Sequence, residues 1–154
     1  MAAADGHPFL AAAASAPELA DWWVASMAPA MLEGGGAGRV PLRVKQLVRL
    51  RVEAQAGVRF PGLGDPADAG ITPAEAAAAA GPLEALPAGI TPAERAALAL
   101  VDEIDFANLE GYLDEAMYAG LKQHFDDGAI FELGQATATL TGLGKFLRVY
   151  GYTG

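Results

Sequence analysis

A seven-residue sequence, Ala-Gly-Ile-Thr-Pro-Ala-Glu, occurs twice in this chain, at residues 69–75 and 88–94. In each copy the threonine can cap a helix, and the glutamate three residues later can accept a hydrogen bond from the threonine backbone. The proline between them suits the first helical position, where no backbone N–H is needed. The similarity ends after the glutamate, so we interpret the copies as two helix starts, at Pro73 and Pro92, rather than as a duplicated unit.

Hydrophobic residues elsewhere in the chain also recur at helical spacing, and strand signals are essentially missing. The predicted helices cover residues 17–33, 40–56, 73–80, 92–105, 110–124 and 129–150. Hydrophobic residues make up 53% of the chain and charged residues 19%, which excludes a disordered chain. We therefore expect an all-α fold, a single-domain bundle of six or seven helices over residues 15–152 that follows an N-terminal tail over residues 1–14.

For four residues in the last third of the chain, the sequence predicts how they pack. Tyr112 and Leu113 are predicted to belong to the buried stripe of the helix over residues 110–124. Gly142 and Gly144 lie within the last predicted helix, where each glycine costs roughly 1 kcal/mol relative to alanine. The close approach of another helix is the best explanation for both glycines.

The chain contains no cysteine. This excludes a disulfide framework, a thiolate metal site, a cysteine nucleophile and dithiol redox chemistry within the chain. Acidic residues outnumber basic residues 19 to 10, and the net charge of −9 argues against a nucleic-acid partner. The two histidines, His7 and His124, are too few for a histidine-rich metal site. We expect neither a metal nor another cofactor.

The N-terminus has no signal-peptide pattern. No positive charge precedes the short apolar stretch Phe9–Ala14, and Asp5 stands where a signal peptide is basic. No apolar run approaches the length that spans a bilayer. We therefore expect a cytoplasmic protein with no membrane partner.

Three segments stand in an order that is typical of a known family: PLRVKQLVRLRVEAQAG at 41–57, TPAERAALALVDEI at 91–104 and HFDDGAIFELGQATATLTGLGKFLRVYG at 124–151. In this order and spacing they resemble the carboxymuconolactone decarboxylase and alkylhydroperoxidase D superfamily. The resemblance extends over roughly residues 15–152. It implies an all-α fold and a homo-oligomer, either a trimer or a hexamer.

The resemblance also locates the proton relay of the peroxidase-like members, in which a Cys-x-x-Cys pair works with a glutamate and a histidine. The two cysteines correspond to Val58 and Pro61, the glutamate to Gln46 and the histidine to Asp65. Valine, proline and glutamine side chains cannot ionise, so thiol peroxidase activity is not expected. Asp65 can still act as an acid or a base.

Residues 39–59 hold six of the ten basic residues and one acidic residue, so this segment carries a net charge of +5. The decarboxylase branch of the family handles a small anionic lactone without a cysteine pair, which requires cationic groups and a general acid or base. The candidate substrate-binding residues are Gln46, Arg51, Val58, Arg59 and Phe60. The candidate catalytic residues are Glu53, Asp65 and His124.

Ordinary ion pairs explain the same charges without a ligand. Glu132 lies one turn into an apolar helix, and if it is buried it needs a cationic partner such as Arg49 or Arg51. Glu53 can likewise pair with a nearby arginine, and His124 can serve as a capping or surface residue at a junction between two helices.

Two functional hypotheses remain open. The first is a non-redox enzyme that acts on a small organic acid, lactone or related metabolite by decarboxylation, isomerisation, cyclisation or dehydration. The second is a catalytically inactive relative that serves as a binding or structural subunit. An ionisable residue in a cavity near Arg51, Val58 and Phe60 favours the first hypothesis, and fully apolar packing there favours the second. A metal site shared between subunits through His124 is a third and weaker hypothesis.

Overall fold

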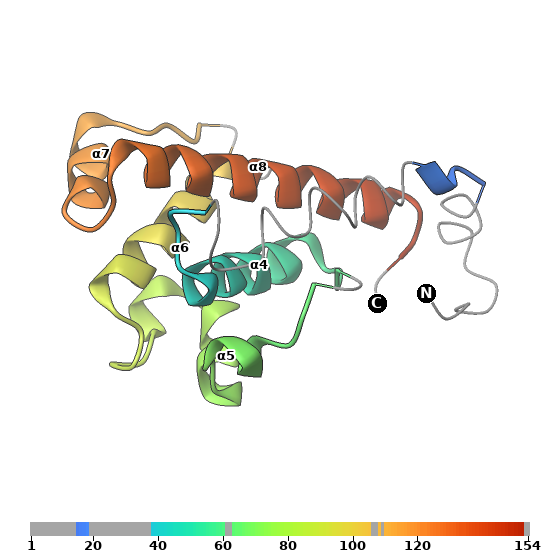
Figure 1. Cartoon of the computed structure of the whole chain (residues 1–154), viewed down its shortest axis with the longest axis horizontal. Coiled ribbons are helices and arrows are strands. Elements are labelled where there is room, and N and C mark those ends of the chain that lie inside the picture. The colour runs from blue at the N-terminus through green and yellow to red at the C-terminus, as the bar shows by residue number, and fades with distance from the viewer. Residues whose placement is uncertain (1–14, 19–37, 61–62, 106–107, 109, 153–154) are drawn as a thin grey trace.

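The computed structural model describes residues 15–18, 38–60, 63–105, 108 and 110–152. Within these residues the secondary structure is helical and contains no strand, which confirms the all-α class. The elements, shown in Figure 1, are α4 (Leu42–Ala56), the 3₁₀ helix η2 (Pro66–Ala69), α5 (Pro73–Ala79), the 3₁₀ helix η3 (Leu83–Ala85), α6 (Pro92–Ile104), α7 (Glu115–Lys122) and α8 (Asp127–Val149).

Helix α4 is the central element of the described fold, since it packs against α5, α6 and α8 (Figure 1). It runs in the same direction as α8. Lys45, near the start of α4, pairs with Glu132 near the start of α8. At the other end, Arg148 of α8 donates to the carbonyl oxygen of Ala56 over 3.3 Å. The basic segment singled out in the sequence therefore lies in the middle of the molecule.

Both repeated heptapeptides form the predicted capping boxes. The hydroxyl groups of Thr72 and Thr91 accept from the backbone N–H of Glu75 and Glu94, and each glutamate accepts in return from its threonine backbone. Helices α5 and α6 begin at the predicted prolines. The predicted helix over residues 17–33 lies, apart from residues 17 and 18, outside the described residues.

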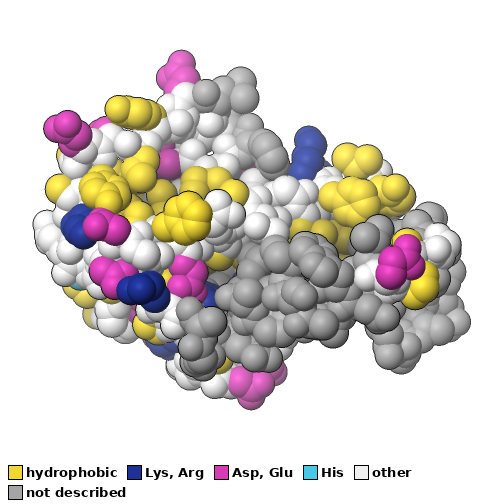
Figure 2. Space-filling view, turned by 45° about the horizontal axis from the view of Figure 1, so that its top comes forward, with side chains coloured by type: hydrophobic (Ala, Val, Ile, Leu, Met, Phe, Trp, Pro, Cys, Tyr) yellow, Lys and Arg dark blue, Asp and Glu magenta, His cyan; other side chains and the backbone are white. Residues whose placement is uncertain are grey.

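The start of α7 differs from the prediction. The helix begins at Glu115 rather than at residue 110, because the carboxylate of Asp114 accepts from the backbone N–H of Met117 and caps it there. Tyr112 and Leu113 precede the helix and are 73% and 40% exposed, so the expectation that they are buried is wrong. Figure 2 shows hydrophobic side chains gathered on the surface at this end of the molecule.

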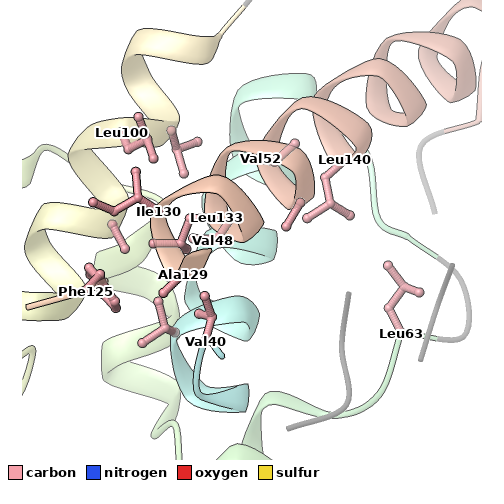
Figure 3. Close-up of a cluster of buried hydrophobic side chains, with 14 of the residues drawn as sticks. Val40, Val48, Val52, Leu63, Leu100, Phe125, Ala129, Ile130, Leu133 and Leu140 are labelled. Atoms are coloured by element: carbon pink, nitrogen blue, oxygen red, sulfur yellow. The ribbon is translucent and has the colours of Figure 1, made fainter. Parts of the chain in front are cut away.

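The main hydrophobic core fills the space between α4, α6 and α8. Val48 and Val52 of α4 meet Leu133 and Leu140 of α8 and Leu100 of α6 there (Figure 3). A second buried cluster lies against another face of α4. It includes Leu47, Ile71, Ala79, Leu86, Ile90 and Leu98. Because α4 is covered on two sides, its hydrophobic residues follow the mixed spacing that the sequence has.

Gly144 lies where α8 comes close to α4. A Cβ atom on Gly144 would stand 2.8 Å from the Cβ of Ala56, which is too short for a contact without movement. A Cβ atom on Gly142 meets no heavy atom within 4 Å. The expectation of close approach is therefore correct for Gly144 and wrong for Gly142.

Alanine at these two glycines is expected to change stability in opposite directions. Gly144→Ala forces α8 away from Ala56, at a cost of about 1–3 kcal/mol in the free energy of unfolding. Gly142→Ala removes a flexible residue from an exposed helix position and is expected to add about 0.5–1 kcal/mol. Urea unfolding of both variants measures the difference, and the same sign for both contradicts the packing described above.

Candidate functional site

The predicted site residues occupy three different environments. Gln46, Glu53, Val58 and Phe60 are buried on or just after α4. Arg51 is also buried, but it faces α5 and α6. The other three, Arg59, Asp65 and His124, are exposed. The structure therefore does not bring the three predicted catalytic residues together.

The buried group is organised by Arg49, which the sequence analysis did not place in the site. Its Nε donates to Oε1 of Gln46 over 2.8 Å, and its Nη1 donates to Oε1 of Glu53 over 3.0 Å. These three side chains are all buried and follow each other at positions i, i+3 and i+7 on α4, so they share one face of the helix. We refer to them as the Gln46–Arg49–Glu53 centre. Their spacing is the signal that could have identified Arg49.

The centre also holds the chain segment that leaves α4. Nε2 of Gln46 donates to the carbonyl oxygen of Leu63 over 3.0 Å, and the backbone N–H of Phe60 donates to Oε1 of Glu53 over 2.9 Å. Val58 and Phe60 are packed into the main core beside it. The surroundings of Val58 and Phe60 therefore contain a buried carboxylate, an amide and a guanidinium group, and they are not fully apolar.

One nitrogen of the centre remains without a partner. Nη2 of Arg49 is buried and makes no hydrogen bond within the described part of the chain. In Arg51, by contrast, every guanidinium nitrogen is used. Its Nε and Nη2 donate to the two carboxylate oxygens of Asp102, and its Nη1 donates to two backbone carbonyl oxygens. The available cationic donor is thus on Arg49, while Arg51 joins helices.

At the opposite end of α4 the surface forms an open pocket with a volume of about 460 Å³, which we call the concave surface. Its charged and titratable lining residues are Arg39, Arg43, Glu94, His124 and Asp126. Along α4, Val44 of this lining and Glu53 of the centre are nine residues apart, or about 14 Å at the rise of an α-helix. His124 thus belongs to the concave surface and not to the centre.

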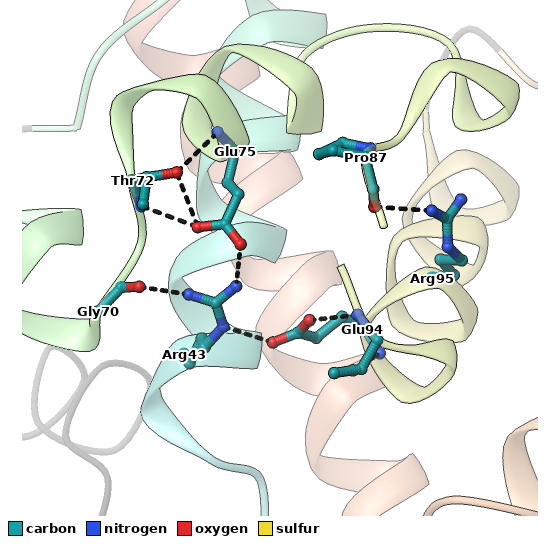
Figure 4. A network of polar contacts seen from close by, with 8 residues as sticks. Arg43, Gly70, Thr72, Glu75, Pro87, Glu94 and Arg95 are labelled. Atoms are coloured by element: carbon teal, nitrogen blue, oxygen red, sulfur yellow. Dashed lines mark hydrogen bonds and ion pairs between the residues drawn. The ribbon is translucent and has the colours of Figure 1, made fainter. Parts of the chain in front are cut away.

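The charges around this concave surface are already paired. Arg43 donates to the carboxylates of Glu75 and Glu94, both over 2.7 Å, and to the carbonyl oxygen of Gly70, as Figure 4 shows. The glutamates of both repeated heptapeptides therefore bind one arginine. Nearby, Nη1 of Arg39 lies 2.9 Å from Oδ2 of Asp126. This balance leaves no excess positive charge to attract an anion.

The pairing also changes proton affinities. The hydrogen bond from Arg43, together with those from the Thr72 backbone and hydroxyl group, lowers the pKa of Glu75 from 4.5 to about 2. The hydrogen bond with Glu75 in turn raises the pKa of Arg43. Both groups thus stay charged over a wide pH range, which is typical of an ion pair that joins two helix starts.

Two further predicted roles receive structural explanations. The carboxylate of Asp65, a candidate acid or base, accepts from the backbone N–H of Ala67 and caps η2. The sequence suggested Arg49 or Arg51 as the partner of Glu132, but Glu132 pairs with neither of them. Its partner is Lys45, 2.5 Å away, because the parallel course of the two helices brings these positions together.

The described part of the chain has neither a cluster of metal-binding side chains nor a membrane-spanning helix. No three His, Asp or Glu side chains in this part of the chain gather where they could hold a metal ion. No helix in the same part is long and apolar enough to cross a membrane.

Comparisons with known proteins do not assign the chain to a family. No family model, no curated protein and no solved structure matches it.

Proposed function

We propose that this chain is a non-redox relative of the carboxymuconolactone decarboxylase family that binds a small organic acid at the Gln46–Arg49–Glu53 centre and acts on it by acid–base chemistry. The observation that carries the proposal is Nη2 of Arg49, a buried guanidinium nitrogen without a partner in the described structure. A buried donor that is left unpaired costs free energy, and such groups call for an explanation. A bound carboxylate provides one.

A guanidinium group suits this ligand chemistry. It stays charged at every physiological pH, and its planar N–H groups match the geometry of a carboxylate. The hydrogen bonds to Gln46 and Glu53 hold the Arg49 side chain in place, so little conformational freedom is lost when a ligand binds. Gln46 is thus a positioning residue in this proposal, and Arg49 is the binding residue.

Glu53 supplies the proton chemistry. Its carboxylate lies 3.0 Å from Nη1 of Arg49 and is therefore next to a carboxylate held on Nη2. From this position it can take a proton from a carbon atom beside a carbonyl group of the ligand and return it elsewhere. Isomerisation and dehydration of a small acid or lactone begin with such a proton removal. Decarboxylation and cyclisation instead require a proton to be delivered to the carbon atom that keeps the electron pair after CO₂ leaves or after the new C–O bond forms. Val58 and Phe60 are packed into the main core beside this carboxylate.

A specific observation also favours the second candidate function, a catalytically inactive binding or structural subunit. Gln46 already holds Leu63, and Glu53 already holds Phe60, against α4. A purely structural clamp accounts for these two contacts, although it leaves Nη2 of Arg49 unexplained.

A thermal-shift screen of the full chain with small mono- and dicarboxylates tests the proposal. We expect at least one acid to raise the melting temperature of the wild type, and Arg49→Lys to abolish this rise because lysine lacks the planar fork. The matched control is Arg51→Lys on the same helix. It is expected to lower the melting temperature of the free protein and to keep the response to the ligand.

Turnover of the acid that binds is then measured by mass spectrometry. Glu53→Gln keeps a side-chain oxygen for Arg49 and Phe60 but has no carboxylate, so we expect it to bind the acid without forming product. No response to any carboxylate in the wild type overturns the proposal and supports the structural clamp. Binding with no product in the wild type supports a binding subunit.

A further inference from the structure

Large hydrophobic side chains lie on the surface where α7 meets the start of α8. Tyr112 and Phe131 are 73% and 70% exposed, and Leu113 and Tyr118 are 40% and 38% exposed. Figure 2 shows hydrophobic side chains gathered at this end of the molecule, on the left of the view. Single apolar residues on a surface are ordinary, but a contiguous group of large ones marks a binding surface. We call these four residues the α7 surface.

Local contacts make the α7 surface continuous. Leu113 directly precedes the capping residue Asp114, and Tyr118 is the fourth residue of α7, two positions whose side chains commonly pack together at a helix start. The hydroxyl group of Tyr118 donates to Oδ1 of Asp127 at the start of α8. Phe131 lies one turn beyond Asp127 on the same face of α8. The surface therefore runs from the segment before α7, across α7 and onto α8.

The surroundings of the α7 surface are acidic. Residues 96–121 contain six acidic residues and no basic residue. The exposed tyrosine and leucine before α7 stand between Glu110 and Glu115, which are themselves exposed and form no ion pair within the described part of the chain. Lys122, at the end of α7, already pairs with Asp127 over 2.7 Å. The surface thus combines apolar contact area with an excess of negative charge.

We infer that the α7 surface binds a basic segment of another protein, in which arginine residues flank one or two large apolar residues. Opposite charge attracts such a segment, and its apolar residues cover Tyr112 and Phe131 from water. Arginine suits both parts of the surface, because it can pair with Glu110 or Glu115 and can also stack on a tyrosine ring. The inference is independent of the proposed function, since no residue of the Gln46–Arg49–Glu53 centre contributes to it.

The negative charge also separates this partner from others. Nucleic acids and acidic membranes are anionic and are repelled by an acidic surface. Four side chains make a contact smaller than a standard stable interface, which is typical of transient complexes. We therefore expect a weak complex. Because salt screens exposed charges, its affinity is expected to fall as the ionic strength rises.

Fluorescence anisotropy of a short labelled peptide of arginine and leucine, titrated with the full chain, tests the inference. Two peptides of the same length serve as controls, one with serine in place of leucine and one with glutamate in place of arginine. We expect the arginine–leucine peptide to bind, the arginine–serine peptide to bind at least fivefold more weakly, and the glutamate–leucine peptide not to bind. Equal binding of the arginine–serine peptide overturns the inference, because net charge alone then explains the attraction.

Single substitutions locate the bound peptide. Tyr112→Ser and Phe131→Ser each remove apolar contact area and are expected to weaken binding of the arginine–leucine peptide at least threefold. Glu115→Gln is expected to weaken binding and to reduce its dependence on salt. The matched control is Val149→Ser at the end of α8, which is 74% exposed and follows a stretch, residues 133–149, without any acidic residue. This control is expected to bind the peptide like the wild type. All four positions are exposed, and circular dichroism checks that the variants keep the fold.

Three outcomes of these measurements overturn the inference. An equal loss of binding in Val149→Ser shows that the peptide covers apolar surface without regard to charge. Self-association of the wild type in sedimentation velocity, if Phe131→Ser abolishes it, shows that a second copy of the chain occupies the surface. Binding of the wild type to uncharged phosphatidylcholine vesicles, if the same variant abolishes it, shows that the surface meets lipid.

Discussion

Glu132→Gln is expected to lower the free energy of unfolding by about 3 kcal/mol, because it leaves a buried lysine without its carboxylate. Lys45 is 1% exposed, and its Nζ lies 2.5 Å from Oε1 of Glu132. The other carboxylate oxygen accepts from the backbone N–H of Arg39 over 2.6 Å, just before α4 begins. We expect the lower end of the range for a broken buried ion pair, since Glu132 retains 21% of its side-chain exposure.

Glu132 also makes stability depend on pH. Burial raises the pKa of Glu132, but the hydrogen bonds with Lys45 and with the Arg39 backbone outweigh this effect, so the pKa lies below its ordinary value of 4.5. A carboxyl group with a lowered pKa stabilises the folded state above its unfolded pKa and loses this contribution as pH falls through the folded value. The wild type is therefore expected to lose more stability than Glu132→Gln on acidification below about pH 4.5.

Urea unfolding measures these effects, with a surface pair as the control. Lys122 and Asp127 pair over 2.7 Å but are 39% and 70% exposed, so Asp127→Asn is expected to cost much less stability than Glu132→Gln. The double variant Lys45→Met with Glu132→Leu replaces the buried charges by apolar groups and is expected to recover most of the loss. An equal cost for Glu132→Gln and Asp127→Asn contradicts the prediction.

Arg51→Met is expected to cost a similar amount, about 3 kcal/mol, because one guanidinium group holds three parts of the fold together. Its two contacts with the carboxylate of Asp102 measure 2.5 and 2.6 Å and connect α4 to α6. Its bonds to the carbonyl oxygens of Ala79 and Gly81, both 2.9 Å, connect α4 to the end of α5. Methionine fills part of the space but leaves all four acceptors without this donor.

Arg95→Met is the matched control for this second prediction. Arg95 donates to the carbonyl oxygens of Leu86 and Pro87 but has no carboxylate partner among the contacts described, so its replacement is expected to cost about 1 kcal/mol. Thermal and urea unfolding of both variants compare the two arginines. If Arg51→Met is no more destabilising than Arg95→Met, the network around Arg51 does not hold the helices together.

The helix starts could be predicted from the sequence because capping is a local interaction. The bonds between Thr72 and Glu75, and between Thr91 and Glu94, join residues that are three positions apart. The start of α7 was predicted less well, since two signals compete there. The apolar residues Tyr112 and Leu113 continue the helical periodicity, whereas Asp114 ends the extended segment and caps the helix.

Part of the candidate site could also be predicted. Gln46, Glu53, Val58 and Phe60 were named from the sequence as candidates, and the structure buries all four on or just after α4. The sequence could not show whether Arg49 or Arg51 has a guanidinium nitrogen left to donate to a ligand. Arg49 and Arg51 are two residues apart on one helix and therefore point in different directions, and only the neighbours of each decide whether its nitrogens are used. Asp102, 51 positions away from Arg51, accepts from two of the Arg51 nitrogens.

The sequence by itself determined the all-α class, the capped starts of α5 and α6 and the exclusion of thiol chemistry, because these depend on residue types and on short-range contacts. The tertiary structure decided which charges meet. Lys45 reaches Glu132 across 87 positions, and Arg43 joins the glutamates of both repeated heptapeptides. An ion pair forms where helix packing brings two side chains within a few ångströms, and the packing depends on the whole hydrophobic core rather than on any local pattern.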